Sequence, residues 1–523
     1  MRRLVIGALA AAGAAAAALA PQAPPDAREV TYRPVSSSVL VCPQMTGAGD
    51  ATNVLGAVVA GPAPGSGSAA LWPLASNDFG VQLPAPGEPV ALRSVGRSQP
   101  PIRMRAEGSW APSAEAGVAA RQQAGTSEGL SSAACTAPGR QWWFVGAGSQ
   151  LGRGAALLVS NAAEEPARFD ITLYAGAGPV QALAGKGIDL GPSSSVRLRL
   201  DALAPDEELL AIHVLATSGR VAAAVRDVAV PSEDRPRGVD FIPPAQAPGT
   251  RLVIAGIPAG DGDRDLVLVN PGSQFATVTP RLLTESGPVA LEGLAAVAVP
   301  AGAIIRVDLT RVLGGRPGTL DLTSDVPVTG GARAVWGGGA RRDVMWLAAV
   351  PLIGGPDPLG GAAAVPSGPG MTTTVTVGAP DGDVRGTLTV TRVEADDLAA
   401  LSGPGGGSPG STDGDSGDRS DDSGAALPEL VLPPDPARTQ AVPVSVPAGS
   451  QSVITVPGGG RGAAPGLVSL SWRSDPGSGP AAVSHTALDD AVPLATGYPW
   501  WPVASSVTAL TVREDLGILA PAG

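Results

Sequence analysis

The sequence predicts an all-β protein built of tandem two-sheet β-sandwiches that follow an apolar N-terminal segment. Three observations support this fold class: abundant glycine and proline, short apolar runs that alternate with polar residues, and an internal repeat of about 109 residues. With 71 glycines and 53 prolines among 523 residues, long helices are disfavoured and turns are frequent. A chain of this length exceeds one hydrophobic core, so several domains are expected.

The N-terminal segment indicates export. A pair of arginines precedes an apolar, mostly alanine run at residues 4–20, which is typical of a secretory signal peptide or a short uncleaved anchor. Pro21 would hinder cleavage after Ala20, and a helix of this length spans roughly 25 Å, which is marginal for a bilayer. Residues 1–28 are therefore predicted to be a signal peptide or membrane anchor, and the protein to be extracytoplasmic, either membrane-anchored or secreted.

The two cysteines, Cys42 and Cys135, fit an exported protein. A pair of cysteines in an oxidising compartment usually forms a disulfide. This bond would close a loop of about 90 residues and contribute about 4–5 kcal/mol on the chain-entropy model. The alternatives are two buried free thiols or half of a metal site. A metal site would need nearby histidines, and the chain has only His213 and His485.

The repeat of about 109 residues is visible in residues that match at a single offset. Asn161 matches Asn270. The same shift relates Leu173 to Leu282, Arg197 to Arg306, and Leu200 to Leu309. Alternation of apolar and polar residues at 169–173 and 196–200 predicts half-buried strands. We therefore expect the four leucines to be buried and the two arginines to face outward.

The repeat defines the predicted domains. Residues 444–449 match residues 297–302, so a further copy lies near the C-terminus. Glycine, serine and aspartate dominate residues 401–440, and such a composition predicts a disordered loop. After the N-terminal segment, the predicted domains are a divergent sandwich with the disulfide (29–140), two sandwich repeats (141–245 and 246–345), and a third repeat interrupted by the loop (346–515). Six or seven strands per repeat favour a sandwich, and the alternative is a β-propeller with two four-stranded blades per repeat.

Three motifs resemble functional sites but lack the required context. Residues 146–152 form a glycine-rich loop like those that bind nucleotides, but a strand rather than a helix should follow it. Residues 406–410 match the glycine-x-serine-x-glycine elbow of hydrolases, but they lie in the predicted disordered loop. Residues 261–265 place three aspartates at the spacing of a calcium loop, but they lack its later ligands, so a solvated turn is favoured.

The histidines and tryptophans are interpreted as structural. His213 and His485 are expected at equivalent late positions of different repeats, too far apart for a triad or a zinc site. Several tryptophans occur near the repeat boundaries: Trp142, Trp143, Trp336, Trp346, Trp500 and Trp501. They could form aromatic platforms for sugars, but packing between neighbouring sandwiches is favoured because the positions recur with the repeat.

The chain resembles known bacterial sequences in its repeat motifs. An aromatic-rich opening at residues 142–149 is followed by a strand ending in Asn161, a glycine-proline-valine turn, and a serine-aspartate-x-proline-valine segment at 324–328. This pattern is similar to bacterial extracellular sandwich repeats. The whole chain resembles an uncharacterised actinobacterial family of exported or membrane-anchored proteins, known only as a domain of unknown function. The resemblance implies immunoglobulin-like sandwiches and a surface location, and it implies no catalytic residues.

Composition and motifs favour a non-enzymatic structural or interaction protein of the bacterial cell envelope. The net charge of −12, without a basic stripe, argues against nucleic-acid binding. We predict no catalytic, cofactor-binding or metal-binding residues and no cofactor. Expected partners are envelope proteins or cell-wall glycans, and the membrane through the N-terminal segment. The alternatives are a carbohydrate- or cell-wall-binding module and an accessory subunit of an envelope enzyme complex.

Overall fold

The computed structural model describes residues 31–509 except for several short segments: 46–49, 61–62, 64, 77–79, 97, 123–126, 230–237, 339–340, 356, 368–369, 394–428, 432–438, 458–465, 490–493 and 504–505. The predicted signal peptide or anchor at 1–28 lies outside the described residues. Within the described part, no helix is both long and apolar enough to cross a membrane. The chain divides into two compact units. In the smaller unit, β1 (Thr31–Pro34) pairs antiparallel with β37 (Ser506–Ala509).

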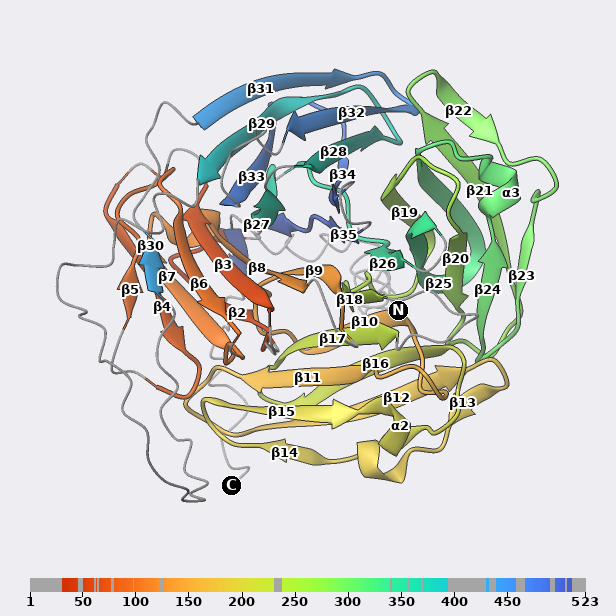
Figure 1. The fold of residues 1–523 in the computed structure, drawn as a ribbon, viewed down its shortest axis with the longest axis horizontal. Coiled ribbons are helices and arrows are strands. Elements are labelled where there is room, and N and C mark those ends of the chain that lie inside the picture. The colour runs from red at the N-terminus through yellow and green to blue at the C-terminus, as the bar shows by residue number, and fades with distance from the viewer. Residues whose placement is uncertain are drawn as a thin grey trace, which may run out of the picture. The chain divides into compact units, whose positions relative to one another are not determined.

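The larger unit, Val35–Ser505, contains four modules, each made of two antiparallel sheets (Figure 1). The second module shows the pattern most simply. One sheet, called the outer sheet, contains β10 (Gln141–Ala147), β16 (Leu210–Ser218), β12 (Ala167–Ala175), β13 (Gly178–Val180) and β14 (Ile188–Leu190). The other, called the axial sheet, has the order β15 (Ser194–Arg199), β11 (Ala156–Asn161), β17 (Ala222–Ala229) and β18 (Gly238–Ile242). A one-turn helix, α2 (Leu200–Leu203), follows β15.

The third module repeats this topology. Its outer sheet contains β19 (Gly249–Ile257), the first half of β25 (Gly318–Gly338), β21 (Ala276–Thr284), β22 (Gly287–Ala290) and β23 (Val297–Val299). Its axial sheet contains β24 (Ile304–Asp308), β20 (Arg264–Val269), the second half of β25 and β26 (Arg341–Ala348). A single long strand, β25, thus passes between the two sheets where the second module has β16 and β17. The module ends with β26 at Ala348, beyond the expected boundary at 345.

The fourth and first modules follow the same plan. The fourth has an outer sheet of β31 (Thr439–Val446), β29 (Val384–Val393), β33 (Gly466–Ser474), β27 (Leu359–Ser367) and β36 (Pro502–Val503), and an axial sheet of β32 (Ser450–Pro457), β28 (Met371–Ala379), β34 (Ala482–Asp489) and β35 (Leu494–Pro499). The first has an outer sheet of β2 (Ser37–Cys42), β7 (Ile102–Gly108), β4 (Gly67–Pro73) and β5 (Val81–Gln82), and an axial sheet of β6 (Val90–Val95), β3 (Thr52–Val59), β8 (Ala114–Gln122) and β9 (Gly129–Ala134).

The segment 401–440 supplies a strand to another module. Most of this predicted disordered loop lies outside the described residues. However, β30 (Glu429–Val431) pairs antiparallel with residues 91–93 of β6 and extends the axial sheet of the first module. The insertion in the fourth module therefore returns to the first module and covers the edge of β6, which would otherwise present unpaired backbone groups.

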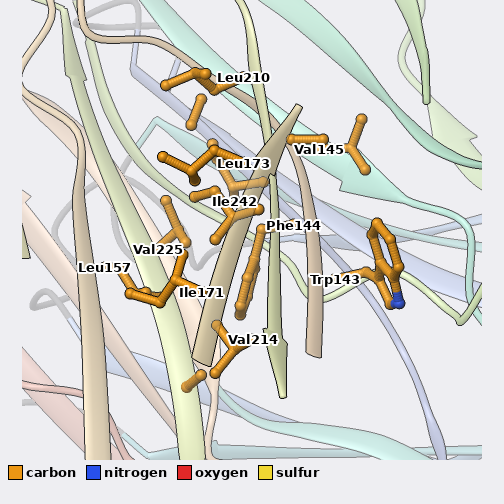
Figure 2. Close-up of a cluster of buried hydrophobic side chains, with 14 of the residues drawn as sticks. Trp143, Phe144, Val145, Leu157, Ile171, Leu173, Leu210, Val214, Val225 and Ile242 are labelled. Atoms are coloured by element: carbon orange, nitrogen blue, oxygen red, sulfur yellow. The ribbon is translucent and has the colours of Figure 1, made fainter. Parts of the chain in front are cut away.

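Each module has one core between its two sheets. In the second module, Phe144 and Ile171 of the outer sheet lie in one cluster with Leu157 and Val225 of the axial sheet (Figure 2). Burial alternates along β12, as expected for a strand with one face in a core. Because the two sheets of a repeat share a core, they form a sandwich, and the propeller alternative is wrong. The second module has nine strands rather than the expected six or seven, because short strands extend the outer sheet.

The expected repeat is confirmed by equivalent environments. Leu173, Leu282, Leu200 and Leu309 are all fully buried. Arg197 and Arg306 are exposed on β15 and β24, as strand alternation predicts. Leu200 and Leu309 lie at the starts of the short helices α2 and α3 (Thr310–Leu313) rather than on strands.

Two asparagines at equivalent positions, Asn161 and Asn270, explain part of the similarity between the second and third modules. Nδ2 of Asn161 donates hydrogen bonds to the carbonyl groups of Glu165 and Gly191, and its Oδ1 accepts one from the Ala163 N–H. Asn270 makes the same turn, with its Oδ1 accepting from the Gly272 N–H at 3.0 Å. Its Nδ2 donates to carbonyl groups at 274 and 299. Both side chains are fully buried, so each asparagine fixes the loop that follows the second strand of its module.

The four modules meet through the last strand of each axial sheet. The contacts form a closed cycle, in which β9 contacts β18, β18 contacts β26, β26 contacts β35, and β35 contacts β9. Figure 1 shows these four strands at the centre of the unit. The modules are therefore joined side by side around an axis, and each contacts its neighbours through buried strands.

Candidate functional site

The predicted disulfide is present between Cys42 and Cys135, with a Cα–Cα distance of 4.1 Å. Cys42 ends β2 of the outer sheet, and Cys135 follows β9, the last strand of the axial sheet, which contacts the neighbouring modules. The bond therefore joins the two sheets of the first module next to the axis. Both residues are buried in the core of that module, so the role of the bond is structural.

Asp343 on β26 accepts hydrogen bonds from every other module. Its Oδ2 accepts from the backbone N–H groups of Leu130 in the first module and Ala495 in the fourth, at 2.8 and 2.9 Å. Its Oδ1 accepts from Val239 in the second module at 3.3 Å and from Val344 at 2.9 Å. The carboxyl is fully buried, and burial raises its pKa to about 8 although the N–H donors act in the opposite direction.

Asp240 on β18 makes a reciprocal set of contacts. Its Oδ1 accepts from the Ser132 N–H of the first module and the Thr496 hydroxyl of the fourth, at 3.2 and 2.9 Å. Its Oδ2 accepts from the Trp346 N–H of the third module at 3.2 Å. Burial raises the pKa of Asp240 well above its usual range. Two buried acids thus connect all four modules at the axis, which indicates a structural function.

Glu115 is a third buried acid, located between the first and fourth modules. It lies on β8, which packs against β27, and its carboxyl reaches the backbone of Gly361 so closely that a Cβ there would lie 2.0 Å from Oε2. Neither carboxyl oxygen has a hydrogen-bond partner in the structure. Burial raises the pKa of Glu115 to about 8. Gly361 is therefore required to make room for this side chain.

The two histidines do not form a site, and their expected equivalence is wrong. His213 lies on β16 in an outer sheet, whereas His485 lies on β34 in an axial sheet. His213 stacks on Trp143, with ring centroids 4.1 Å apart. His485 accepts a hydrogen bond at Nδ1 from the Trp500 indole at 2.9 Å, and burial lowers its pKa to about 3. Each histidine therefore belongs to the packing of its own module.

In the aspartate loop 261–265, an arginine fills the place that a cation would take. The guanidinium of Arg264 is buried and donates hydrogen bonds to five backbone carbonyl groups, those of Pro258, Ala259, Gly262, Asp263 and Val335. The loop oxygens therefore already bind a positive charge. Across the described ranges, no three histidine, cysteine, aspartate or glutamate side chains are grouped to hold a metal ion.

Three of the six tryptophans near the repeat boundaries are core residues. Trp143, Trp346 and Trp500 are at most 5% exposed, which leaves no ring face for a sugar. Trp346 of the third module packs against Gly146 of the second, where a Cβ would lie 2.2 Å from the indole ring. Packing between neighbouring sandwiches, the favoured interpretation, is confirmed for this residue.

The glycine-rich loop 146–152 connects two strands. It follows β10 and leads to β11, so it has no helix N-terminus to bind a phosphate. Its backbone instead pairs with the loop before β16, because the Ser149 N–H donates to the Glu207 carbonyl at 2.8 Å. The hydrolase-like motif at 406–410 lies outside the described residues.

A cavity of about 200 Å³ lies between the second and third modules. The second module contributes the end of the glycine-rich loop, the segment before β16 and the end of β17. The third contributes the start of β20 and residues of β24, β25 and β26. The lining residues are Gln150, Gly152, Arg153, Glu208, Leu209, Asp227, Ala229, Asp263, Val267, Arg306, Arg333, Val344 and Trp346.

The three arginines of the cavity lining each pair with a carboxylate. Arg153 binds Asp227 through Nε and Nη2, at 3.2 and 2.6 Å. Arg306 of the third module reaches Glu208 of the second at 2.7 Å. Arg333 donates to Asp265 at 3.0 Å. The first and third pairs are mostly buried, whereas the second is half-exposed and bridges the modules at the edge of the cavity.

The sequence did not indicate this cavity, because its residues come from seven separate segments. One signal was available, because two lining residues lie at motifs that resembled ligand loops. Arg153 directly follows the glycine-rich loop 146–152, and Asp263 belongs to the aspartate loop 261–265. Both motifs border the cavity, although neither has the predicted chemistry. The axial acids also had a signal, since Asp240 and Asp343 are carboxylates within apolar strands.

The fold and the cavity define the class of protein. It is an all-β protein of serial two-sheet sandwiches whose modules meet at a common axis. Residues 90–401 match DUF5719, a family of unknown function, and this match covers more than half of the chain. The chain therefore belongs to this family. The match begins in β6 and extends past β29, so it includes the second and third modules completely. No curated protein matches the sequence significantly.

Proposed function

We propose that this protein is a non-enzymatic structural or interaction protein of the bacterial cell envelope, located outside the cytoplasmic membrane. The observation that carries the proposal is the pair of axial acids, Asp240 and Asp343, each of which binds all the other modules. Such buried networks fix a unique arrangement. A rigid unit of four modules holds its outer sheets and loops in constant positions, where they can contact partners.

The location is supported by the disulfide and the N-terminal sequence. A disulfide that closes a long loop persists in oxidising compartments and is rare in the cytosol. The apolar run at residues 4–20 and the resemblance to exported actinobacterial proteins support the same assignment. The two-sheet modules are also consistent with immunoglobulin-like domains, which often serve as spacers and interaction modules in surface proteins.

The experiment combines fractionation with crosslinking of the full-length protein in intact cells. The expected result is recovery outside the cytosol, a Cys42–Cys135 peptide in an unreduced digest, and specific crosslinked partners after mild treatment of the envelope. A control variant, Cys135→Ser, identifies the peptide by its loss. Recovery in the cytosol with both thiols free would refute the location. Recovery outside the cytosol without any crosslinked partner would refute the interaction role.

A further inference from the structure

The cavity between the second and third modules has the features of a ligand site. It is enclosed by residues of both modules, so it exists only when the modules are joined. Its volume of about 200 Å³ is below the usual range for drug-sized ligands, about 300–1,000 Å³. It equals the liquid volume of about seven water molecules. The cavity therefore has room for one small ring and not for several.

The arginines of the cavity have unused hydrogen-bond donors. Arg306 and Arg333 each bind their carboxylate through a single nitrogen, Nη2 and Nη1 respectively. A guanidinium carries five N–H groups in a planar fork, so most donors of these two side chains have no acceptor in the protein. These donors can therefore pair with a small molecule that enters the cavity.

The charges of the lining determine which ligand fits. Three arginines face three lining carboxylates, Glu208, Asp227 and Asp263, so the positive charge is balanced. A site for phosphate or another free anion requires an excess of positive charge or a helix N-terminus, and neither is present here. Hydroxyl groups both donate and accept hydrogen bonds. They can pair with the free guanidinium donors and with the carboxylates at the same time.

We infer that this cavity binds one neutral, polyhydroxylated ring, that is, a single sugar residue. The partly exposed apolar side chains of the lining, Leu209 and Ala229, would contact the C–H faces of such a ring. This inference goes beyond the proposed interaction role and does not depend on it, because that role is tested by protein crosslinking.

The test is calorimetric titration of the full-length chain with glucose, galactose, mannose and N-acetylglucosamine. Inorganic phosphate and acetate serve as anionic probes. Two variants alter the cavity in different ways: Arg306→Ala removes donors from its half-exposed edge, and Ala229→Leu fills part of its volume. The matched control is Arg197→Ala, because Arg197 occupies the equivalent position on β15 and does not line the cavity. Thermal unfolding verifies that each variant is folded.

The expected result is saturable binding of at least one sugar. Both cavity variants should weaken this binding at least tenfold, and Arg197→Ala should leave it unchanged. Binding of phosphate or acetate without any sugar would overturn the assigned ligand class. Sugar binding that both cavity variants retain would show that the sugar does not bind in this cavity. An absence of saturable binding for every probe would overturn the inference entirely.

Discussion

Replacing Glu115 by glutamine should change how the stability of the protein depends on pH. The carboxyl of Glu115 is buried between β8 and β27, and neither oxygen has a hydrogen-bond partner. Glutamine has almost the same shape but cannot ionise. The substitution therefore removes the titration of this group while leaving the packing against Gly361 almost unchanged.

The size of the effect follows from the pKa of Glu115. Burial raises it from 4.5 to about 8, a difference that corresponds to roughly 5 kcal/mol. Between these values the folded protein holds a proton that the unfolded chain releases. The free energy of unfolding therefore falls as the pH rises from about 4.5 to about 8, and it is constant beyond these limits. The glutamine variant avoids this loss, so it should exceed the parent in stability at alkaline pH.

The assay is calorimetric unfolding of the parent and Glu115→Gln between pH 5 and pH 9. We expect similar midpoints at pH 5 and a midpoint several degrees higher for the variant at pH 8.5. Glu88→Gln is the control, because it makes the same substitution at an exposed position of the same module. Since Asp240 and Asp343 titrate in the same direction, the difference between variant and parent is the informative quantity. A difference that stays constant over this pH range would refute the reasoning.

Four further perturbations test the fold. Asp343→Asn replaces an oxygen that accepts two N–H groups by an amide donor, so chemical denaturation should show a loss of about 2–5 kcal/mol, and unchanged stability would contradict the axial role. Asn270→Ala leaves buried backbone groups without partners, so hydrogen exchange should accelerate in the loop after β20. Exchange in that loop at the rate of the parent protein would contradict the role of Asn270. Leu309→Ala should lower stability by about 2–5 kcal/mol, whereas Arg197→Ala should change it by less than about 1 kcal/mol; similar losses would show that the repeat is not structural. Cys135→Ser should lower stability by about 2–5 kcal/mol, measured against the oxidised parent, and equal stability would contradict a structural disulfide.

The parts of the fold that were predictable from sequence depend on local pattern. Alternation along residues 169–173 predicted a strand, and it is β12. The offset between Asn161 and Asn270 predicted equivalent modules, because each asparagine fixes a turn that lies close to it in the chain. The disulfide was predictable because the chain has a single pair of cysteines and an N-terminal sequence typical of export, where such a pair usually forms a bond.

The parts that were missed depend on contacts between modules. Asp343 binds N–H groups that belong to residues far away in the sequence, and no local pattern encodes these partners. The cavity is similar, since Arg306 and Glu208 meet only when two modules pack together. The equivalence of His213 and His485 failed for a related reason, because the two sheets of a module contain strands of similar composition.

The guanidinium of Arg264 has a consequence for the conditions that the protein tolerates. Loops rich in aspartate and backbone oxygens commonly depend on dissolved calcium, so their shape changes when the ion is removed. Here the positive charge is covalently part of the chain and cannot dissociate. Chelators or fluctuating calcium levels should leave the 258–264 loop unchanged, and with it one wall of the neighbouring cavity. In the third module, the side chain of Arg264 therefore replaces a dissociable cation with a charge that is covalently bound to the chain.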